Sequence, residues 1–448
     1  MMELKRKMYD TLLSWKLKDK GTSALFVDGA RRVGKSHICA SFAKNEYRSF
    51  ILVDFANVPK QVRAIFEEDG DDLDTFFLKL SAFYHTKLYE RASVIVFDEV
   101  QQFPQARQLV KYLVADHRYD YIETGSLITL SQNNQDIVIP SEEEHVEMFP
   151  LDFEEYLWAM GDEVTISILR QFFDNRRPLG QALHRRVMND FRKYLLVGGM
   201  PQAVEEFAES GDFEQVDRIK RRILTLYRED VAKFAKGYEA RVFSLFDQIP
   251  SQLTRKEKRF KLSSLGEHAR LRDYEDAFIW LDEAMVINTC FNTEDPYGSL
   301  EMSARHSTLK CYMGDTGLLV TLAFMDQKYQ DNDLYRAILL DKMNVNEGMI
   351  AENAVAQMLR AQGHRLFFYS RPANGNRANM MEIDFLIPNG RKISPIEVKS
   401  GSYQKHASLD KFRRRFTKNM GESYILYTKD ILVKDGIVHL PLYMAMFL

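Results

Sequence analysis

The sequence has few of the features that mark secreted or membrane proteins. Its three cysteines, Cys39, Cys290 and Cys311, are widely spaced and give neither a zinc motif nor a disulfide framework. No apolar run approaches the roughly 20 residues of a membrane span, and the first ten residues lack the apolar core of a signal peptide. We therefore expect a cytoplasmic protein that has no membrane partner.

The chain also has little net charge. Its 61 basic and 64 acidic side chains leave a formal charge of −3, so any contact with nucleic acid must come from a local patch. Its 448 residues are enough for roughly three domains, and a hydrophobic content of 45% is enough for ordinary cores. Internal repeats and low-complexity linkers are absent from the sequence.

The stretch D-G-A-R-R-V-G-K-S at 28–36 carries the first functional signal. From its first glycine it fits the pattern G-x-x-x-x-G-K-[ST], in which glycines let backbone N–H groups turn towards a polyphosphate. An apolar strand is expected at 24–28 and a helix at 36–44, which is the context that this loop requires. Lys35 should reach the β- and γ-phosphates of ATP, and the Ser36 hydroxyl should coordinate Mg²⁺. The expected nucleotide-binding residues of the loop are Gly29, Ala30, Arg31, Arg32, Val33, Gly34, Lys35 and Ser36.

A second signal is V-I-V-F-D-E, which ends at Glu99. Four apolar residues predict a buried parallel strand, and ligands bind at the carboxyl ends of such strands in open α/β sheets. We expect Asp98 to hold Mg²⁺ and Glu99 to act as the base for the attacking water. The strand that begins at Tyr119 can end in a sensor of the γ-phosphate, and the sequence does not choose between Thr124 and Ser126. The alternation of strands and helices implies a parallel sheet with helices on both faces.

Five motifs follow one another along the chain, G-A-R-R-V-G-K-S, V-I-V-F-D-E-V-Q, T-G-S, F-P-L-D-F-E-E-Y-L and L-L-V-G-G-M-P-Q-A-V. Their order and spacing give the chain a resemblance to the archaeal-type AAA+ ATPases with a C-terminal domain of unknown function. The resemblance implies an α/β protein with a P-loop AAA+ core at 1–149, a helical lid at 150–240, a winged helix-turn-helix at 241–342 and a PD-(D/E)XK restriction-endonuclease-like α/β domain at 343–448. In AAA+ proteins a lid arginine often contacts the γ-phosphate, and the choice among candidates stays open. These candidates are Arg192, Arg221, Arg222 and Arg228.

The winged-helix segment offers two kinds of surface. A basic run lies between its first two expected helices and could hold a phosphate backbone of DNA or RNA. The expected recognition helix at 272–283 is acidic and would repel DNA, so we favour a partner protein or a second copy of the chain for that helix. The basic residues are Arg255, Lys256, Lys258, Arg259 and Lys261, and the acidic ones are Asp273, Glu275, Asp276, Asp282 and Glu283.

Three segments near the C-terminus resemble the PD-(D/E)XK nuclease pattern. A helix that opens with G-M-I-A-E carries Glu352, the strand M-E-I-D-F carries Asp384, and the strand P-I-E-V-K carries Glu397 and Lys399. Residues two apart on a strand share a face, so Glu397 and Lys399 point the same way. Asp384 and Glu397 are expected to bind Mg²⁺ or Mn²⁺, with Glu352 extending the metal shell. Lys399 would then act on the attacking water.

These patterns predict an ATPase coupled to a metal-dependent nuclease that acts on DNA or RNA. One alternative is a nucleotide-dependent switch that binds partners and cuts nothing. Another is a DNA-binding regulator that uses the winged helix. The sequence identifies neither the nucleic-acid substrate nor the oligomeric state.

Overall fold

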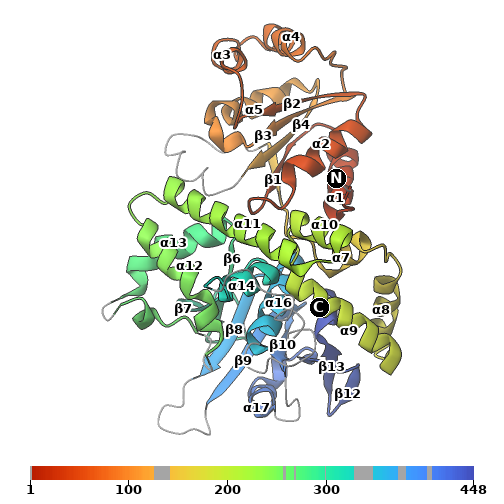
Figure 1. Cartoon of the computed structure of the whole chain (residues 1–448), viewed down its shortest axis with the longest axis vertical. Helices are drawn as coiled ribbons and strands as arrows, with labels where there is room; N and C mark the ends of the chain where they lie inside the picture. Colours follow the sequence, from red (N-terminus) through yellow and green to blue (C-terminus); the bar gives the residue numbers. More distant parts are fainter. Residues whose placement is uncertain are drawn as a thin grey trace. The chain divides into compact units, whose positions relative to one another are not determined.

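The computed structural model describes residues 3–125, 142–255, 259–266, 269–297, 299–326, 347–371, 380–400 and 406–448. The chain divides into two compact units, residues 3–149 and residues 150–448 (Figure 1). Among the described residues, no helix has both the length and the apolar character needed to cross a membrane.

The N-terminal unit, residues 3–149, is built on a five-stranded parallel sheet with the order β2-β3-β4-β1-β5. This confirms the predicted parallel sheet. Because β4 lies between β1 and β3, the carboxyl ends of these three strands are neighbours. The strands are β1 Ala24–Asp28, β2 Ser49–Asp54, β3 Ser93–Asp98, β4 Asp120–Gly125 and β5 Glu143–Glu147.

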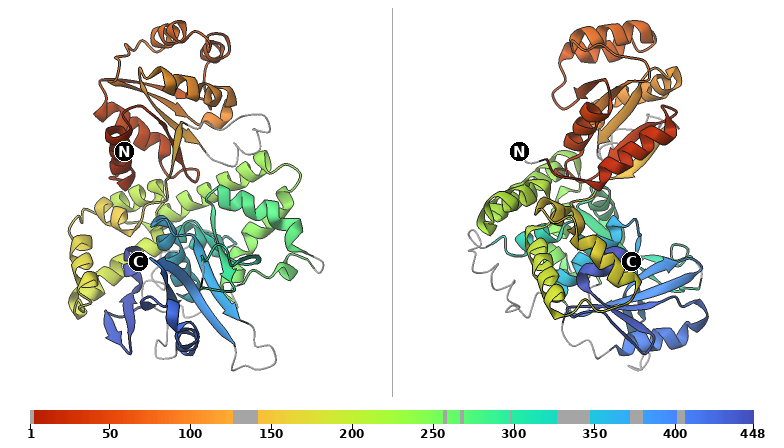
Figure 2. Two further views of the ribbon diagram at one scale, coloured as in Figure 1. Left: turned by 180° about the vertical axis from the view of Figure 1, so that it is seen from behind. Right: turned by 90° about the vertical axis from the view of Figure 1, so that its right-hand side faces the viewer.

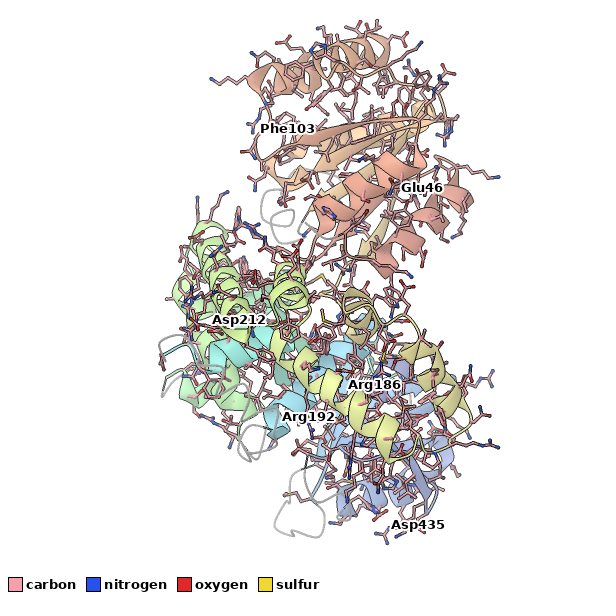
Figure 3. All side chains as sticks on the ribbon, turned by 45° about the vertical axis from the view of Figure 1, so that its right-hand side comes forward. Glu46, Phe103, Arg186, Arg192, Asp212 and Asp435 are labelled. Atoms are coloured by element: carbon pink, nitrogen blue, oxygen red, sulfur yellow. The ribbon has the colours of Figure 1, made fainter. Side chains whose placement is uncertain are left out.

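Helices cover both faces of this sheet (Figure 2). α3, α4 and α5 share one core with the sheet, in which aromatic rings dominate. Phe103, at the start of α5 (Figure 3), stacks on Phe55 with ring centroids 5.4 Å apart. α1 and α2 pack on each other, and α2 contacts β2, β3 and β4. The helices are α1 Lys7–Asp19, α2 Lys35–Glu46, α3 Lys60–Glu68, α4 Leu73–Phe83 and α5 Pro104–Asp116.

The C-terminal unit, residues 150–448, begins with a run of helices. Asp152 and Glu155 form a capping box at the first of them, which explains the start of the F-P-L-D-F-E-E-Y-L motif. Asp212 caps α11 (Figure 3). The helices are α7 Phe153–Ala159, α8 Thr165–Asp174, α9 Gln181–Val197, α10 Pro201–Ser210, α11 Phe213–Phe234, α12 Glu239–Leu253, α13 Leu271–Glu283, α14 Thr316–Ala323, α16 Glu347–Ala361 and α17 Ala407–Arg415.

The second sheet is mixed and has eight strands in the order β12-β13-β11-β10-β9-β8-β6-β7. β6 runs parallel to β8, with Cys290 opposite Leu366. The hairpin β6–β7 of the expected winged helix therefore continues the sheet of the expected nuclease-like domain. The strands are β6 Ile287–Thr293, β7 Ala304–Met313, β8 Leu366–Arg371, β9 Met381–Asn389, β10 Lys392–Val398, β11 Ser423–Tyr427, β12 Leu432–Lys434 and β13 Ile437–Pro441.

The expected division into four domains stays a prediction. The second sheet runs across the expected border at 342/343, and the division into two compact units falls after residue 149. Within the expected winged helix, the second expected helix, which follows the basic run, is only a 3₁₀ turn, Leu262–Ser264, in the part that the structure describes. Lys256 and Lys258 of the basic run lie outside the described residues.

The double-glycine motif after α9 has a packing role. Asp315, which caps α14 through the Leu318 N–H, also accepts a hydrogen bond of 2.6 Å from the N–H of Gly199. A Cβ atom at Gly199 would lie 2.1 Å from the carbonyl oxygen of Leu151, so no larger residue fits without a backbone shift. The motif thus fixes the α9–α10 turn against the start of α14.

Candidate functional site

The loop between β1 and α2 has the backbone of an anion site. Arg32 and Gly34 take left-handed conformations, with φ of 73° and 98°. Gly34 is the N-cap of α2 and no side chain caps that end, so the first-turn N–H groups are available to an anion. At Gly29 a Cβ atom would lie 2.4 Å from the backbone oxygen of Met148, which explains the first glycine of the pattern.

Lys35 lies folded back on its own loop. Its Nζ donates to the carbonyl oxygens of Gly29, at 2.6 Å, and Ala30, at 3.1 Å. Burial lowers the pKa of Lys35, while the nearby carboxylates, Glu99 above all, act in the opposite direction. A polyphosphate in this loop would give the buried ammonium a charged partner in place of two neutral carbonyls.

Three predicted residues meet at one carboxylate. The hydroxyl of Ser36 donates to Oδ1 of Asp98 at 2.7 Å, and the hydroxyl of Thr124 donates to the same oxygen. Thr124 also accepts a bond of 3.2 Å from the N–H of Glu99. Hydroxyl and carboxylate oxygens are the donors that Mg²⁺ prefers, so these residues fit the ion. The other candidate sensor, Ser126, lies outside the described residues.

Glu99 has a partner that the sequence did not reveal. Glu99 follows β3 in a left-handed conformation, with φ of 54°. Its Oε2 accepts a hydrogen bond of 2.5 Å from Nε2 of Gln101, whose side chain is buried. Gln101 therefore orients the proposed base. Gln101 is the last residue of the V-I-V-F-D-E-V-Q motif, so the only sequence feature that pointed to it was the resemblance to the AAA+ family.

A buried charge cluster lies beside the site. Arg107 of α5 makes a two-point ion pair with Glu143 of β5, at 2.7 and 3.2 Å. Glu123 of β4 is fully buried, and neither of its carboxylate oxygens has a hydrogen-bond partner among the described residues. Burial, together with the charge of Glu143, raises the pKa of Glu123 well above its ordinary value. The pKa of Glu143 is lowered, because His145 and Arg107 outweigh the effect of burial.

We expect Glu123→Gln to stabilise the protein at neutral pH. A carboxyl with a raised folded-state pKa contributes its full stability only below the unfolded pKa, and loses it as the pH rises through the folded value. The amide removes this loss, so the free energy of unfolding at pH 7 should rise by about 1–3 kcal/mol. Urea unfolding at pH 5 and pH 8 measures the effect, which should be larger at pH 8. Glu143→Gln is the control and should destabilise, since it breaks a buried ion pair. An unchanged pH dependence in Glu123→Gln would contradict this account.

Two of the four candidate lid arginines make ion pairs within the C-terminal unit, whereas Arg222 is exposed. Arg221 of α11 pairs with Asp217 at 2.7 Å and donates to the carbonyl oxygen of Met325 at 3.0 Å. Arg228 pairs with Asp247. Arg192 lies on α9 (Figure 3). The contact of a lid arginine with the γ-phosphate stays a prediction.

The four residues of the nuclease-like pattern lie near one another in the C-terminal unit. Lys399 Nζ is 2.9 Å from Oε2 of Glu397, and Asp384 Oδ2 accepts a bond of 2.9 Å from the N–H of Val398. Burial raises the pKa of Glu397 despite the opposing charge of Lys399. Burial disfavours the charged form of Lys399, but Glu397 outweighs it and raises the pKa of Lys399. The fourth residue, Glu352 of α16, is buried.

A fifth residue, Lys310 of β7, occupies the place where these acids converge. Its Nζ lies 3.3 Å from Oε1 of Glu352 and 3.5 Å from Oδ1 of Asp384. Glu382 of β9 is equally close, at 3.2 Å. The chemistry of this set does not fit a divalent cation, because an ammonium already lies among the carboxylates. The sequence contains one indication of this buried ammonium, because a lysine lies inside the apolar strand L-K-C-Y-M.

Three segments of the chain match known protein families. Residues 21–157 match a family described as AAA domain. Residues 188–329 and 347–444 match two families described as domains of unknown function, DUF8612 and DUF4143. No curated protein matches the chain. The first match supports the expected AAA-type ATPase core, whereas the winged helix and the nuclease-like domain stay predictions.

Among solved structures, the chain is similar to the Walker-type ATPase PABY2304 of Pyrococcus abyssi. The TM-score is 0.42 at 16% identity, covering 71% of this chain and 96% of that one. It is also similar to the Orc1 protein of Aeropyrum pernix, solved in complex with DNA, with a TM-score of 0.26, 12% identity and coverage of 72% and 93%. For Cdc6p of Pyrobaculum aerophilum the values are 0.26, 12%, 77% and 96%.

Proposed function

We propose that residues 3–149 bind MgATP and hydrolyse it. The N–H groups at the start of α2 and the ammonium of Lys35 would hold the phosphates. Ser36 and Asp98 would hold Mg²⁺, which when bound neutralises charge between the β- and γ-phosphates. Thr124 would sense the γ-phosphate. The observation that carries the proposal is the convergence of the Ser36 and Thr124 hydroxyls on Asp98.

Glu99 would act as the base. Its carboxylate takes a proton from the water that attacks the γ-phosphate, and the amide of Gln101 fixes one of its oxygens, leaving the other for the water. Because the N–H of Glu99 donates to Thr124, the base and the sensor are linked through one hydroxyl group. The loss of the γ-phosphate would therefore shift Glu99 through the Thr124 hydroxyl.

We expect Lys35→Ala to weaken MgATP binding on the order of a hundredfold, because it removes a buried charge that meets the phosphates. Isothermal titration calorimetry of the full chain with MgATP measures this. Lys44→Ala, an exposed lysine near the other end of α2, is the matched control and should bind like the parent. Parental affinity in Lys35→Ala would rule out the phosphate-loop assignment.

For the C-terminal unit we favour a nucleotide-dependent switch over a metal-dependent nuclease. The pairing of Glu397 with Lys399 supports a nuclease-like arrangement, but the position of Lys310 among the acids supports a site that cuts nothing. A nuclease of this pattern needs a divalent cation at the acids and a switch does not. Contact with DNA or RNA through the basic run, a partner protein or second copy at α13, and a cytoplasmic location remain proposals from the sequence.

A further inference from the structure

Lys310 is a fully buried cation with several negative neighbours. Its side chain has no exposed surface, and its Nζ lies within 3.5 Å of carboxylate oxygens of Glu352, Glu382 and Asp384. The ring of Phe368 covers another side, with its centroid 5.0 Å from Nζ. An opposite charge within about 4–6 Å favours the charged form of an amine, and the carboxylate oxygens of three acids lie closer to Nζ than that. The amine therefore stays an ammonium.

Each of the three acids that would bind a metal has at least one carboxylate oxygen that is already engaged by a nitrogen or hydroxyl group of the chain. Oδ1 of Asp384 forms an ion pair with Nζ of Lys310, and Oδ2 of Asp384 accepts a hydrogen bond from the N–H of Val398. Glu397 faces Lys399 with Oε2 and accepts a bond of 3.0 Å from the N–H of Leu409 with Oε1. Oε1 of Glu352 also accepts a hydrogen bond from the hydroxyl of Tyr312, a second residue of β7. Each of the three expected metal ligands is thus held by donors of the protein itself.

The distances also favour an ammonium over a metal ion. The three carboxylate oxygens lie 3.2–3.5 Å from Nζ, whereas Mg²⁺ and Ca²⁺ hold oxygens at roughly 2.0–2.6 Å. A divalent cation could enter only after the lysine side chain had left, because two positive charges cannot share this buried space.

We propose that Lys310 is a built-in cation that replaces the divalent metal ion expected from the nuclease-like pattern. The C-terminal unit then keeps its acids in a nuclease-like arrangement while it binds neither Mg²⁺ nor Mn²⁺ at these residues. Lys310 comes from β7, whereas the acids come from α16 and β9. The charge that closes the site is therefore supplied by the segment expected to be a winged helix.

The test is a titration of the full chain with Mn²⁺ in the absence of nucleotide, followed by the electron paramagnetic resonance signal of free Mn²⁺. The wild type and Asp384→Asn should bind Mn²⁺ equally, since Asp384 belongs to no metal site. Lys310→Met should gain one site at least tenfold tighter than any in the wild type, and Lys310→Met/Asp384→Asn should lose it. Lys392→Met, an exposed lysine of β10, is the control and should gain nothing.

Two results would overturn the proposal. One is wild-type binding of Mn²⁺ that Asp384→Asn weakens tenfold or more, and the other is a folded Lys310→Met protein that gains no site. If Lys310→Met does not fold, the comparison of the wild type with Asp384→Asn still decides. Because no nucleotide is present, the outcome does not depend on the proposed ATPase activity.

Discussion

Glu99→Gln should bind MgATP with parental affinity and hydrolyse it at least about a hundredfold more slowly. General bases contribute roughly 10²- to 10⁴-fold to a rate, and an amide has the shape of the carboxylate but accepts no proton from water. The phosphate loop, Ser36 and Asp98 remain intact in this variant, so bound ATP should persist. Phosphate release in single turnovers, with binding measured in parallel by calorimetry, separates the two steps.

Two further variants make this test specific. Asp98→Asn should already weaken the binding of MgATP, because it weakens the oxygen set for Mg²⁺ and disrupts the contacts with Ser36 and Thr124. Gln101→Ala should give an intermediate rate with normal ATP binding, because it frees the base without removing it. Parental hydrolysis by Glu99→Gln would show that another residue activates the water.

The N-terminal unit could be predicted because its determinants are local. The glycines of 28–36, the lysine after them and the apolar strand before them form one continuous stretch, and each fixes its own backbone. The acids at the end of β3 likewise follow directly from a buried run. Local sequence patterns could not predict which side chains pair across neighbouring strands. The pairing of Thr124 with Asp98 depends on β4 lying beside β3, which only the strand order reveals.

The C-terminal unit was harder for the same physical reason. The acids Glu352, Asp384 and Glu397 could be recognised from three short segments, but the charge among them comes from β7, far away in the sequence. Its position depends on the parallel pairing of β6 with β8, a long-range contact that no local pattern encodes. A lysine in an otherwise apolar strand indicated that a buried acid must pair with it, but the sequence did not identify that acid.

Lys310→Met should lower the free energy of unfolding of the C-terminal unit by about 3–5 kcal/mol, the usual cost of leaving buried charges without their partner. Methionine is close to lysine in volume and only one atom shorter, so most of the loss reports the ammonium rather than a cavity. Urea unfolding in the presence of EDTA measures it, as a lower midpoint with an unchanged slope.

The matched control neutralises the acids as well. Lys310→Met combined with Glu352→Gln, Glu382→Gln and Asp384→Asn should recover most of the loss, because the set around position 310 is then neutral and no longer needs a cation. Lys399→Met should cost less than Lys310→Met, since the side chain of Lys399 is 27% exposed and water already screens part of its charge, whereas Lys310 has no exposed surface. If Lys310→Met lost less than about 1 kcal/mol, the value typical of an exposed ion pair, the ammonium would not be what holds these acids together. The nuclease-like arrangement would then have to be stabilised by the backbone and hydroxyl donors of Val398, Leu409 and Tyr312 alone.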